Sequence, residues 1–222
     1  MSSLTLFHCP GACSRVVLNA LEEARVPFEE RPVNIFRGEQ RSPELLAVNP
    51  KGKVPALKVD EILLTENASI LLYLHETYPE AALLPPATNA LARAAQRSDL
   101  MWIASTLHPM VRTMVMPDRV STQDADGVRA GATAQFAPIA AAIDARLQAN
   151  TWWYGDSWSI VDVYLYWALS MAAIGRFDLT PLPSILAHAG RVRERDSFRR
   201  ALAREQAAVD SGKITPPPGS SL

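Results

Sequence analysis

The segment Cys9-Pro10-Gly11-Ala12-Cys13-Ser14 could hold a reactive thiol. Leu4–His8, before it, has the composition of a short strand, and Ser14–Ala24, after it, shows the apolar spacing of a helix. A group at a helix N-terminus meets unpaired backbone N–H groups and the positive end of the helix dipole, which favour a thiolate or another anionic sulfur. The alternative is structural, with Cys13 as a small core residue and Ser14 as a helix cap.

A second candidate is Lys53-Val54-Pro55, which follows the turn cluster that begins at Asn49. A proline at the start of a short strand, after a glycine turn, is suited to a cis peptide bond in a tight corner. Such a bond presents the N–H and C=O of Val54 to an extended, peptide-like ligand. An ordinary edge-strand proline would show the same residue types.

A third candidate is Thr65-Glu66-Asn67, at the start of a predicted helix. The backbone N–H groups there, with Asn67, can hold a carboxylate, while Glu66 can accept from an ammonium group. A ligand with both groups on one carbon, the end of an α-amino acid, fits this pair. Plain helix capping explains the same residue types.

The secondary-structure elements that must position these residues are predicted to be strands and helices in the first third of the chain and helices alone in the rest. Strands are predicted at Leu4–His8, Phe28–Val33, Val54–Val59 and Ile62–Leu64, and helices at Ser14–Ala24, from Ser42 onward and at Ala68–Thr77. Residues 81–89 follow Pro79 and include Pro85 and Pro86, and they predict a linker. Everything beyond is helical in pattern, with long helices from Leu91 to Met116, interrupted at Pro109, and from Asp126 to Ala149, and a buried one from Ser159 to Ile174. We therefore expect an α/β domain at 1–80 and an all-α domain at 90–222, ending in a flexible tail.

Composition narrows the class of protein. The chain has 222 residues, 48% hydrophobic and 20% charged, with a formal net charge of −1, which excludes a disordered chain and argues against a nucleic-acid partner. The longest nearly apolar stretch is too short to span a membrane, and no signal peptide is evident. The two cysteines do not complete a four-ligand metal site, so no metal is expected. A reduced, cytoplasmic protein is the expectation.

Taken together, the three candidate segments resemble the N-terminal, thioredoxin-like domain of the cytosolic glutathione transferases. Asn49-Pro50-Lys51-Gly52-Lys53-Val54-Pro55-Ala56-Leu57 resembles that family's cis-proline turn, and Leu64-Thr65-Glu66-Asn67-Ala68-Ser69-Ile70 its γ-glutamyl-binding helix start. In the second domain, Gly155-Asp156-Ser157-Trp158-Ser159-Ile160-Val161-Asp162 resembles the family's Ser-x-x-Asp helix cap. The resemblance covers residues 4 to 208. It implies a βαβαββα thioredoxin-like domain followed by an all-helical domain.

Within that family, Pro10-Gly11-Ala12-Cys13-Ser14 is similar to the bacterial beta-type transferases. The resemblance implies that Cys13 lies beside the sulfur of glutathione, that Ser14 donates to it, and that His108 is the histidine of the second domain's first long helix. The chain departs from the beta-type pattern at Phe7, where a tyrosine is usual, and at Pro109, where a lysine is usual. Asn67 stands where many transferases carry serine.

The resemblance also implies binding roles. The expected contacts of glutathione are Cys9, Gln40, Arg41, Lys53, Val54, Pro55, Glu66, Asn67 and Asp99. Gln40 and Arg41 would meet the glycine carboxylate, and Asp99 would reach the γ-glutamyl ammonium across a dimer interface. Phe7, Met110 and Met114 are expected to line an adaptable apolar pocket for the second substrate.

The function that follows is conjugation of the glutathione thiolate to a small apolar electrophile, a detoxifying reaction with glutathione as co-substrate and no further cofactor. A homodimer is implied by the resemblance. Three alternatives stay open. One is a thiol-disulfide oxidoreductase that uses Cys13 or Cys9 as nucleophile, and another is a non-catalytic glutathione-binding protein. The last is an isomerase of a maleyl-type acid, supported by Ser14-Arg15.

Overall fold

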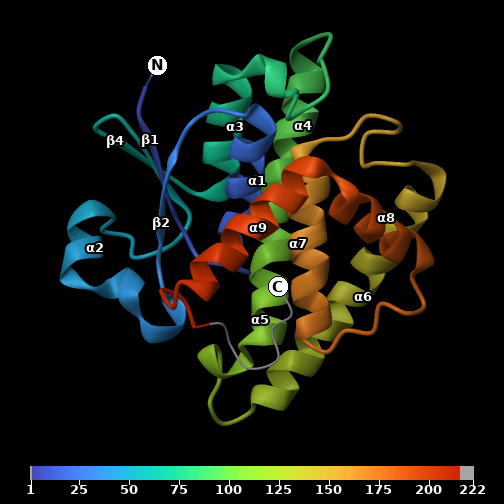
Figure 1. Cartoon of the computed structure of the whole chain (residues 1–222). Helices are drawn as coiled ribbons and strands as arrows, with labels where there is room; N and C mark the ends of the chain where they lie inside the picture. The colour runs from blue at the N-terminus through green and yellow to red at the C-terminus, as the bar shows by residue number, and fades with distance from the viewer. Residues whose placement is uncertain (1, 216–222) are drawn as a thin grey trace. The chain divides into compact units, whose positions relative to one another are not determined.

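A mixed sheet forms the centre of the N-terminal part of the protein. The computed structural model describes residues 2–215, and within them four strands form one sheet of order β2-β1-β3-β4 (Figure 1). The strands are β1 (Leu4–His8), β2 (Glu29–Pro32), β3 (Ala56–Val59) and β4 (Ile62–Thr65). The pair β1–β2 is parallel, because α1 forms the crossover between them, whereas β1–β3 and β3–β4 are antiparallel. This order confirms the predicted thioredoxin-like topology.

The helices of this N-terminal part flank the loops that carry the predicted site residues. They are α1 (Ser14–Ala24), α2 (Pro43–Val48) and α3 (Asn67–Thr77), with short 3₁₀ turns η1 (Ile35–Arg37), η2 (Glu39–Arg41) and η3 (Pro79–Ala81). The apolar side chains of α1, such as Val17, Leu18 and Leu21, are fully buried. Because α1 begins directly after β1, its N-terminus and the carboxyl end of that strand share one short turn.

The chain divides into two compact units. One runs to Leu83 and resumes at Arg195, and the other is Leu84–Glu194. The last helix, α9 (Asp196–Asp210), packs along α1 and so belongs with the sheet, although the sequence placed it in the helical domain. Of the predicted flexible tail, residues 216–222 lie outside the described residues.

The second unit is helical. It contains α4 (Ala90–Trp102), η4 (Ile103–Leu107), α5 (His108–Val115), η5 (Pro117–Arg119), α6 (Ala125–Ala149), α7 (Ile160–Ile174) and α8 (Pro183–Glu194). The interruption predicted at Pro109 is a π-helical stretch, η4, just before that proline. Proline has no N–H to donate, and the wider π turn accommodates the lost bond without ending the helix.

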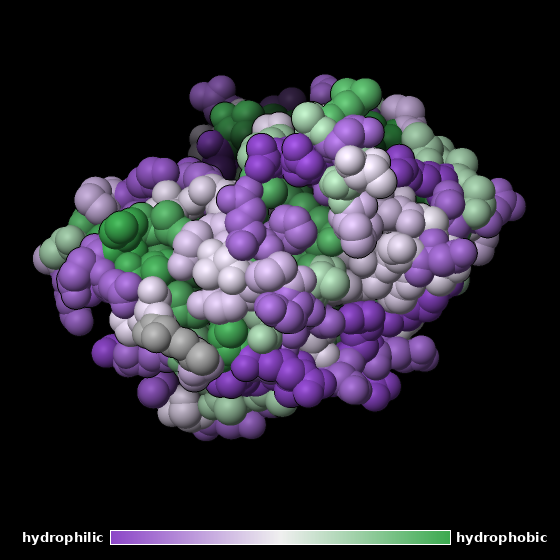
Figure 2. Space-filling model, turned by 90° about the horizontal axis from the view of Figure 1, so that it is seen from above, coloured by the Kyte–Doolittle hydropathy of each residue, from purple (hydrophilic) through white to green (hydrophobic). Residues whose placement is uncertain are grey.

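Several large apolar side chains remain exposed around α2 in the first unit. Phe36 is 42% exposed, Leu46 37% and Val48 39%. Figure 2 shows that, on the face it presents, hydrophobic side chains gather in patches between hydrophilic ones. Val48 also lines a depression of the first unit that contains several predicted site residues, so this depression has a partly apolar rim.

Candidate active site

The turn between β1 and α1 is held by hydrogen bonds of its own. The Ala12 amide donates to the Cys9 carbonyl at 3.1 Å, and the Ser14 hydroxyl donates to the same oxygen at 3.1 Å. The Cys9 amide in turn donates to the Ser14 oxygen at 3.0 Å. Gly11 takes φ +76°, a left-handed conformation that favours glycine. The fully buried Ser14 hydroxyl therefore fixes the turn, a role that the sequence analysis did not assign to it.

Cys13 is the residue of this turn that faces a candidate ligand-binding group. It occupies the N-cap position of α1, makes no side-chain capping bond, and is 7% exposed. Its thiol lies 3.6 Å from the Val54 carbonyl oxygen, as a sulfur donor would. The backbone N–H groups and dipole of α1 favour a negative charge at this position. A cysteine thiol therefore lies at the start of α1, at the place where the sequence predicted it.

Cys9 has a different environment. It is fully buried and packs with Ala208 and Ile214, and its thiol points to the Pro10 carbonyl at 3.7 Å. Burial raises the pKa of the Cys9 thiol to about 12, so almost none of it is thiolate at neutral pH. Cys9 is therefore poorly suited to the predicted contact with glutathione or to the role of nucleophile, because a buried neutral thiol is a weak nucleophile.

The peptide bond between Val54 and Pro55 is cis, as the sequence predicted. The turn before it is organised by Asn49, whose side-chain amide donates to the Lys53 carbonyl at 2.7 Å. The Asn49 side-chain oxygen also accepts from the Lys51 amide at 3.2 Å. Asn49 is nearly buried, and it is a supporting residue that the sequence analysis recognised only as part of a turn.

The depression in the first unit brings several predicted residues together. Phe7, Gln40, Lys53 and Val54 all line it. The segment that carries Gln40 is held against the Asn49–Lys53 turn, since a Cβ placed on Gly52 would lie 3.3 Å from the Gln40 carbonyl. Arg41 follows Gln40 and is exposed, outside the lining of the depression. Gln40 and Lys53 thus supply an amide and a cation beside the Val54 backbone.

Glu66 and Asn67 occupy the start of α3, as predicted. Glu66 is the N-cap, with an exposed side chain and a backbone φ of +70°, a conformation rare for a non-glycine residue. Asn67 is 5% exposed. The Lys51 ammonium lies 3.3 Å from the Glu66 carboxylate and donates to the Thr65 hydroxyl at 2.7 Å. Lys51, which is not among the site residues predicted from the sequence, thus binds the carboxylate that is expected to accept from an ammonium group.

In the helical unit, His108 is the first residue of α5. Its Nδ1 lies 3.0 Å from the Tyr164 hydroxyl, and its ring meets the Trp167 ring edge-on with centroids 4.4 Å apart. The imidazole is half-buried and held by these two aromatic residues of α7. Its orientation is therefore fixed by the core of its own unit.

The methionines predicted for the second-substrate pocket have different environments. Met110 is half-buried on α5, but Met114 is fully buried. A Cβ placed on Gly175 would lie 2.6 Å from the Met114 Cβ, which shows how closely α5 and the end of α7 approach there. Met114 packs in the helical core, so of the two methionines only Met110 has an exposed surface for the predicted second-substrate pocket.

Asp99 has partners within the helical unit. Its Oδ2 accepts from the Trp153 indole N–H at 2.9 Å and from the Tyr154 hydroxyl at 2.8 Å. Burial, followed by the Asp99 hydrogen bond and charge, raises the pKa of Tyr154 above its usual value. Within its own unit Asp99 therefore anchors the loop that precedes α7, and its contact with an ammonium group of glutathione across a dimer interface stays a prediction.

The predicted Ser-x-x-Asp cap is present at the start of α7. Asp162 Oδ2 accepts from the Ser159 amide and hydroxyl, each at 2.9 Å, and its Oδ1 accepts from the Trp153 amide at 2.8 Å. The buried His188 adds a fourth contact, with Nε2 2.9 Å from Oδ1. This cluster is a folding element, and its histidine was not predicted.

Two other expectations concern absences. Among residues 2–215, no group of histidine, cysteine and acidic side chains is arranged to hold a metal ion. The helices described in that range are also too short or too polar to cross a membrane.

Comparison with known proteins decides the family. Residues 6–82 match the family model described as "Glutathione S-transferase, N-terminal domain". The chain is 31% identical over 204 residues to glutathione S-transferase GstA of Escherichia coli O157:H7, and the match covers 91% of this chain and 98% of that protein. The chain belongs to the cytosolic glutathione S-transferase superfamily. This membership confirms the resemblance drawn from the three sequence segments.

Two more relatives show what this transferase is similar to. Its sequence is 33% identical over 186 residues to the maleylacetoacetate isomerase of Pseudomonas aeruginosa, with 82% of this chain and 87% of that protein covered. A sphingomonad glutathione S-transferase, solved in complex with glutathione, has a TM-score of 0.80 and 33% identity, and covers 91% of this chain and 98% of its own. Our chain is therefore a glutathione-dependent enzyme of this superfamily.

Proposed function

We propose that the protein conjugates glutathione to a small apolar electrophile, with Cys13 beside the reacting sulfur. The observation that carries this proposal is the position of Cys13, 3.6 Å from the Val54 carbonyl at the N-terminus of α1. A ligand extended along the Val54 backbone would place its sulfur against this helix end. The similarity to a transferase solved with glutathione supports the same ligand.

The remaining residues of the first unit suit the two ends of glutathione. Glu66 would accept from the γ-glutamyl ammonium, and the N-terminal N–H groups of α3, with Asn67, would hold the adjacent carboxylate. Gln40 and Lys53 would meet the glycine carboxylate at the depression that they line. The γ-glutamyl ammonium of glutathione would displace the Lys51 ammonium from Glu66, since the two ammonium groups compete for one carboxylate.

In the reaction, the helix N-terminus lowers the pKa of the glutathione thiol, and the thiol proton passes to solvent. The thiolate then forms a carbon–sulfur bond with the electrophile, and the leaving group departs with its electron pair. Val54 and Cys13 would orient the sulfur toward the electrophile, and this orientation lowers the entropic part of the activation barrier. His108, on its aromatic support, is a further candidate catalytic group. A cytoplasmic homodimer acting in detoxification is the corresponding biological proposal.

Thiol-disulfide exchange is the second candidate, favoured by the presence of a cysteine at the helix start. In that reaction the Cys13 thiolate attacks the glutathione sulfur of a mixed disulfide, and the other thiol leaves as its thiolate. A second glutathione thiolate then attacks the Cys13–glutathione disulfide, which restores Cys13 and releases oxidised glutathione. The buried Cys9 has no part in either step.

Isomerisation of a maleyl-type acid has support from the similarity to maleylacetoacetate isomerase. The sequence feature cited for it, Ser14-Arg15, does not add to that support. Arg15 is nearly buried and paired with Glu205, and the Ser14 hydroxyl is used within the turn. Neither side chain is directed to an acidic substrate.

The variant Cys13→Ala separates the two leading functions. In conjugation glutathione supplies the nucleophile, so we expect a partial loss of kcat/KM with chlorodinitrobenzene, about tenfold or less. In exchange Cys13 is the nucleophile, so activity with a mixed disulfide of glutathione should be abolished. Cys9→Ala is the matched control and should retain both activities. Complete loss of conjugation in Cys13→Ala would contradict the assignment of the nucleophile to glutathione.

A further inference from the structure

Glu205, on the C-terminal helix α9, contacts the turn that carries Cys13. Its Oε1 accepts from the Gly11 amide at 3.2 Å, and its Oε2 accepts from Arg15 Nε at 2.8 Å and from the second guanidinium nitrogen at 2.5 Å. Glu205 is fully buried and Arg15 is 8% exposed. One carboxylate thus binds the turn on both sides of Cys13, at Gly11 before it and at Arg15 after it.

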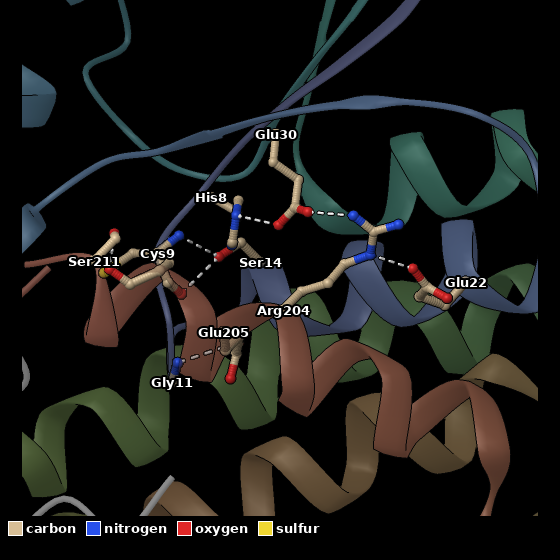
Figure 3. A network of polar contacts seen from close by, with 10 residues as sticks. His8, Cys9, Gly11, Ser14, Glu22, Glu30, Arg204, Glu205 and Ser211 are labelled. Carbon is tan, nitrogen blue, oxygen red and sulfur yellow. Dashed lines mark hydrogen bonds and ion pairs between the residues drawn. The ribbon is translucent and has the colours of Figure 1, made fainter. Parts of the chain in front are cut away.

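These contacts complete the restraint of the turn. The Ser14 hydroxyl holds Cys9, just after β1, and Glu205 holds the Gly11 amide (Figure 3). Between them the Cys13 thiol faces the Val54 carbonyl at 3.6 Å. The turn that carries Cys13 is therefore contacted by a residue that lies 190 positions beyond Arg15 in the sequence.

The negative charge of Glu205 is also favourable near the N-terminus of α1. The first turn of α1 contains no acidic residue and does contain Arg15, a cation at the positive end of the helix dipole. A buried carboxylate beside Arg15 neutralises that cation and is itself stabilised by the dipole. Glu205 thus supplies, from another helix, the acidic group that helices often carry in their own first turn.

Further ion pairs hold α9 in register with α1. Glu22 of α1 accepts from Arg200 at 2.6 Å and also binds Arg204, which reaches Glu30 as well (Figure 3). A fourth ion pair joins Arg195 to Glu23 at 2.6 Å. The register of α9, and with it the place of the Glu205 carboxylate, is fixed by several contacts along α1.

We propose that Glu205 is a positioning residue of the active site, which holds the Cys9–Ser14 turn so that Cys13 and the α1 N-terminus face the glutathione sulfur. The proposal rests on the proposed function for its catalytic readout. It extends the site to a helix that the sequence placed in the other domain. Glu205 contacts no reacting atom, and it acts through the Gly11 amide.

The test compares two double variants, Arg15→Met/Glu205→Gln and Arg15→Met/Glu205→Leu. Both remove the ion pair without leaving a buried charge, but only glutamine retains an acceptor for the Gly11 amide. We expect kcat with glutathione and chlorodinitrobenzene to be about 3- to 10-fold lower in the leucine variant than in the glutamine variant, no more than the loss expected for Cys13→Ala. KM for glutathione should be similar in the two, because Glu66, Asn67 and Val54 are untouched.

A second readout needs no catalysis. The pH midpoint of Cys13 alkylation by iodoacetamide, located by mass spectrometry, should lie higher in the leucine variant because the thiolate is less well aligned with α1. Glu39, which besides burial and together with Glu205 raises the pKa of Cys9 in this turn, is the same in both variants. Equal kcat values and equal midpoints would overturn the proposal.

The two readouts would give a different set of results if the proposed transferase function, and not the positioning role of Glu205, were wrong. If the wild-type protein does not turn over glutathione but the two midpoints differ, the positioning role stands and the transferase proposal fails. Should the leucine variant not fold, Glu205→Asp replaces it, because its shorter side chain keeps the charge near Arg15 and withdraws the acceptor from Gly11. A wild-type kcat and midpoint in Glu205→Asp would overturn the proposal equally.

Discussion

At the scale of single residues, the two cysteines of one turn have opposite characters. Cys13 lies at the N-terminus of α1 against the Val54 carbonyl, whereas Cys9 is packed among the apolar side chains Ala208 and Ile214. The segment predicted a reactive thiol, but residue spacing alone does not show which of the two buried cysteines faces the Val54 carbonyl. The two cysteines differ because Cys9 packs against the C-terminal part of the chain, and no residue of the turn itself indicates that contact.

We expect iodoacetamide to modify Cys13 and leave Cys9 unmodified in the folded protein. With a pKa of about 12, Cys9 is about one part in ten thousand thiolate at pH 8, and it is also buried. Peptide mapping after alkylation at pH 8 measures both sites in one experiment. Alkylation in denaturant, where both cysteines react, is the control. Equal labelling of Cys9 in the native protein would contradict this account.

At the scale of elements, local patterns predicted most of the first unit. The bounds of β1 and α1 are those that the sequence indicated, because strand composition, a Pro-Gly break and helical apolar spacing follow one another directly. The cis bond before Pro55 and the cap at Ser159 were also predictable from short motifs. Contacts across long sequence separations, such as those of Glu205 and His188, leave no such local pattern.

The cap of α7 provides a stability prediction. Asp162→Ala would remove the acceptor of two backbone amides, of the Ser159 hydroxyl and of His188, all buried. We expect the free energy of unfolding to fall by about 3 kcal/mol or more. Urea unfolding measures it, and Asp156→Ala, at an exposed position in the preceding loop, is the control. A change below about 1 kcal/mol would contradict the role given to this cluster.

The contact of α9 with β2 predicts a pH dependence. Burial alone would raise the pKa of Glu30, but hydrogen bonds from His8 and Arg204 outweigh burial and hold it below its usual value. A carboxylate whose pKa is lowered by folding stabilises the protein above its unfolded pKa, and this contribution is lost as the pH falls through the folded pKa.

We therefore expect Glu30→Gln to cost up to about 1 kcal/mol of unfolding free energy at pH 7, since Arg204 is partly exposed. The difference from wild type should shrink as the pH falls below the ordinary glutamate pKa and through the lowered pKa of Glu30, where Glu30 itself becomes protonated. Urea unfolding at a series of pH values measures the difference. A constant difference from pH 7 to pH 3 would contradict the linkage.

At the scale of the whole molecule, the family is shown by similarity along nearly the entire chain. The sequence predicted an α/β domain followed by a helical one, and each unit has the expected class of fold. The sequence did not predict that α9 would pack in the first unit. The apolar spacing of an amphipathic helix shows that one face is buried, but it does not show which surface that face packs against. The Glu205 contact, the least predictable feature of the site, follows from that packing.

The most direct test of the central claim is a crystal structure of the protein with glutathione. We expect the sulfur within hydrogen-bonding distance of the Cys13 thiol, the cysteinyl backbone paired with Val54, and the γ-glutamyl end on Glu66 and Asn67. Lys51 should then have left the Glu66 carboxylate. A protein crystallised at saturating glutathione with no ligand at this position, or with its sulfur remote from Cys13, would contradict the account.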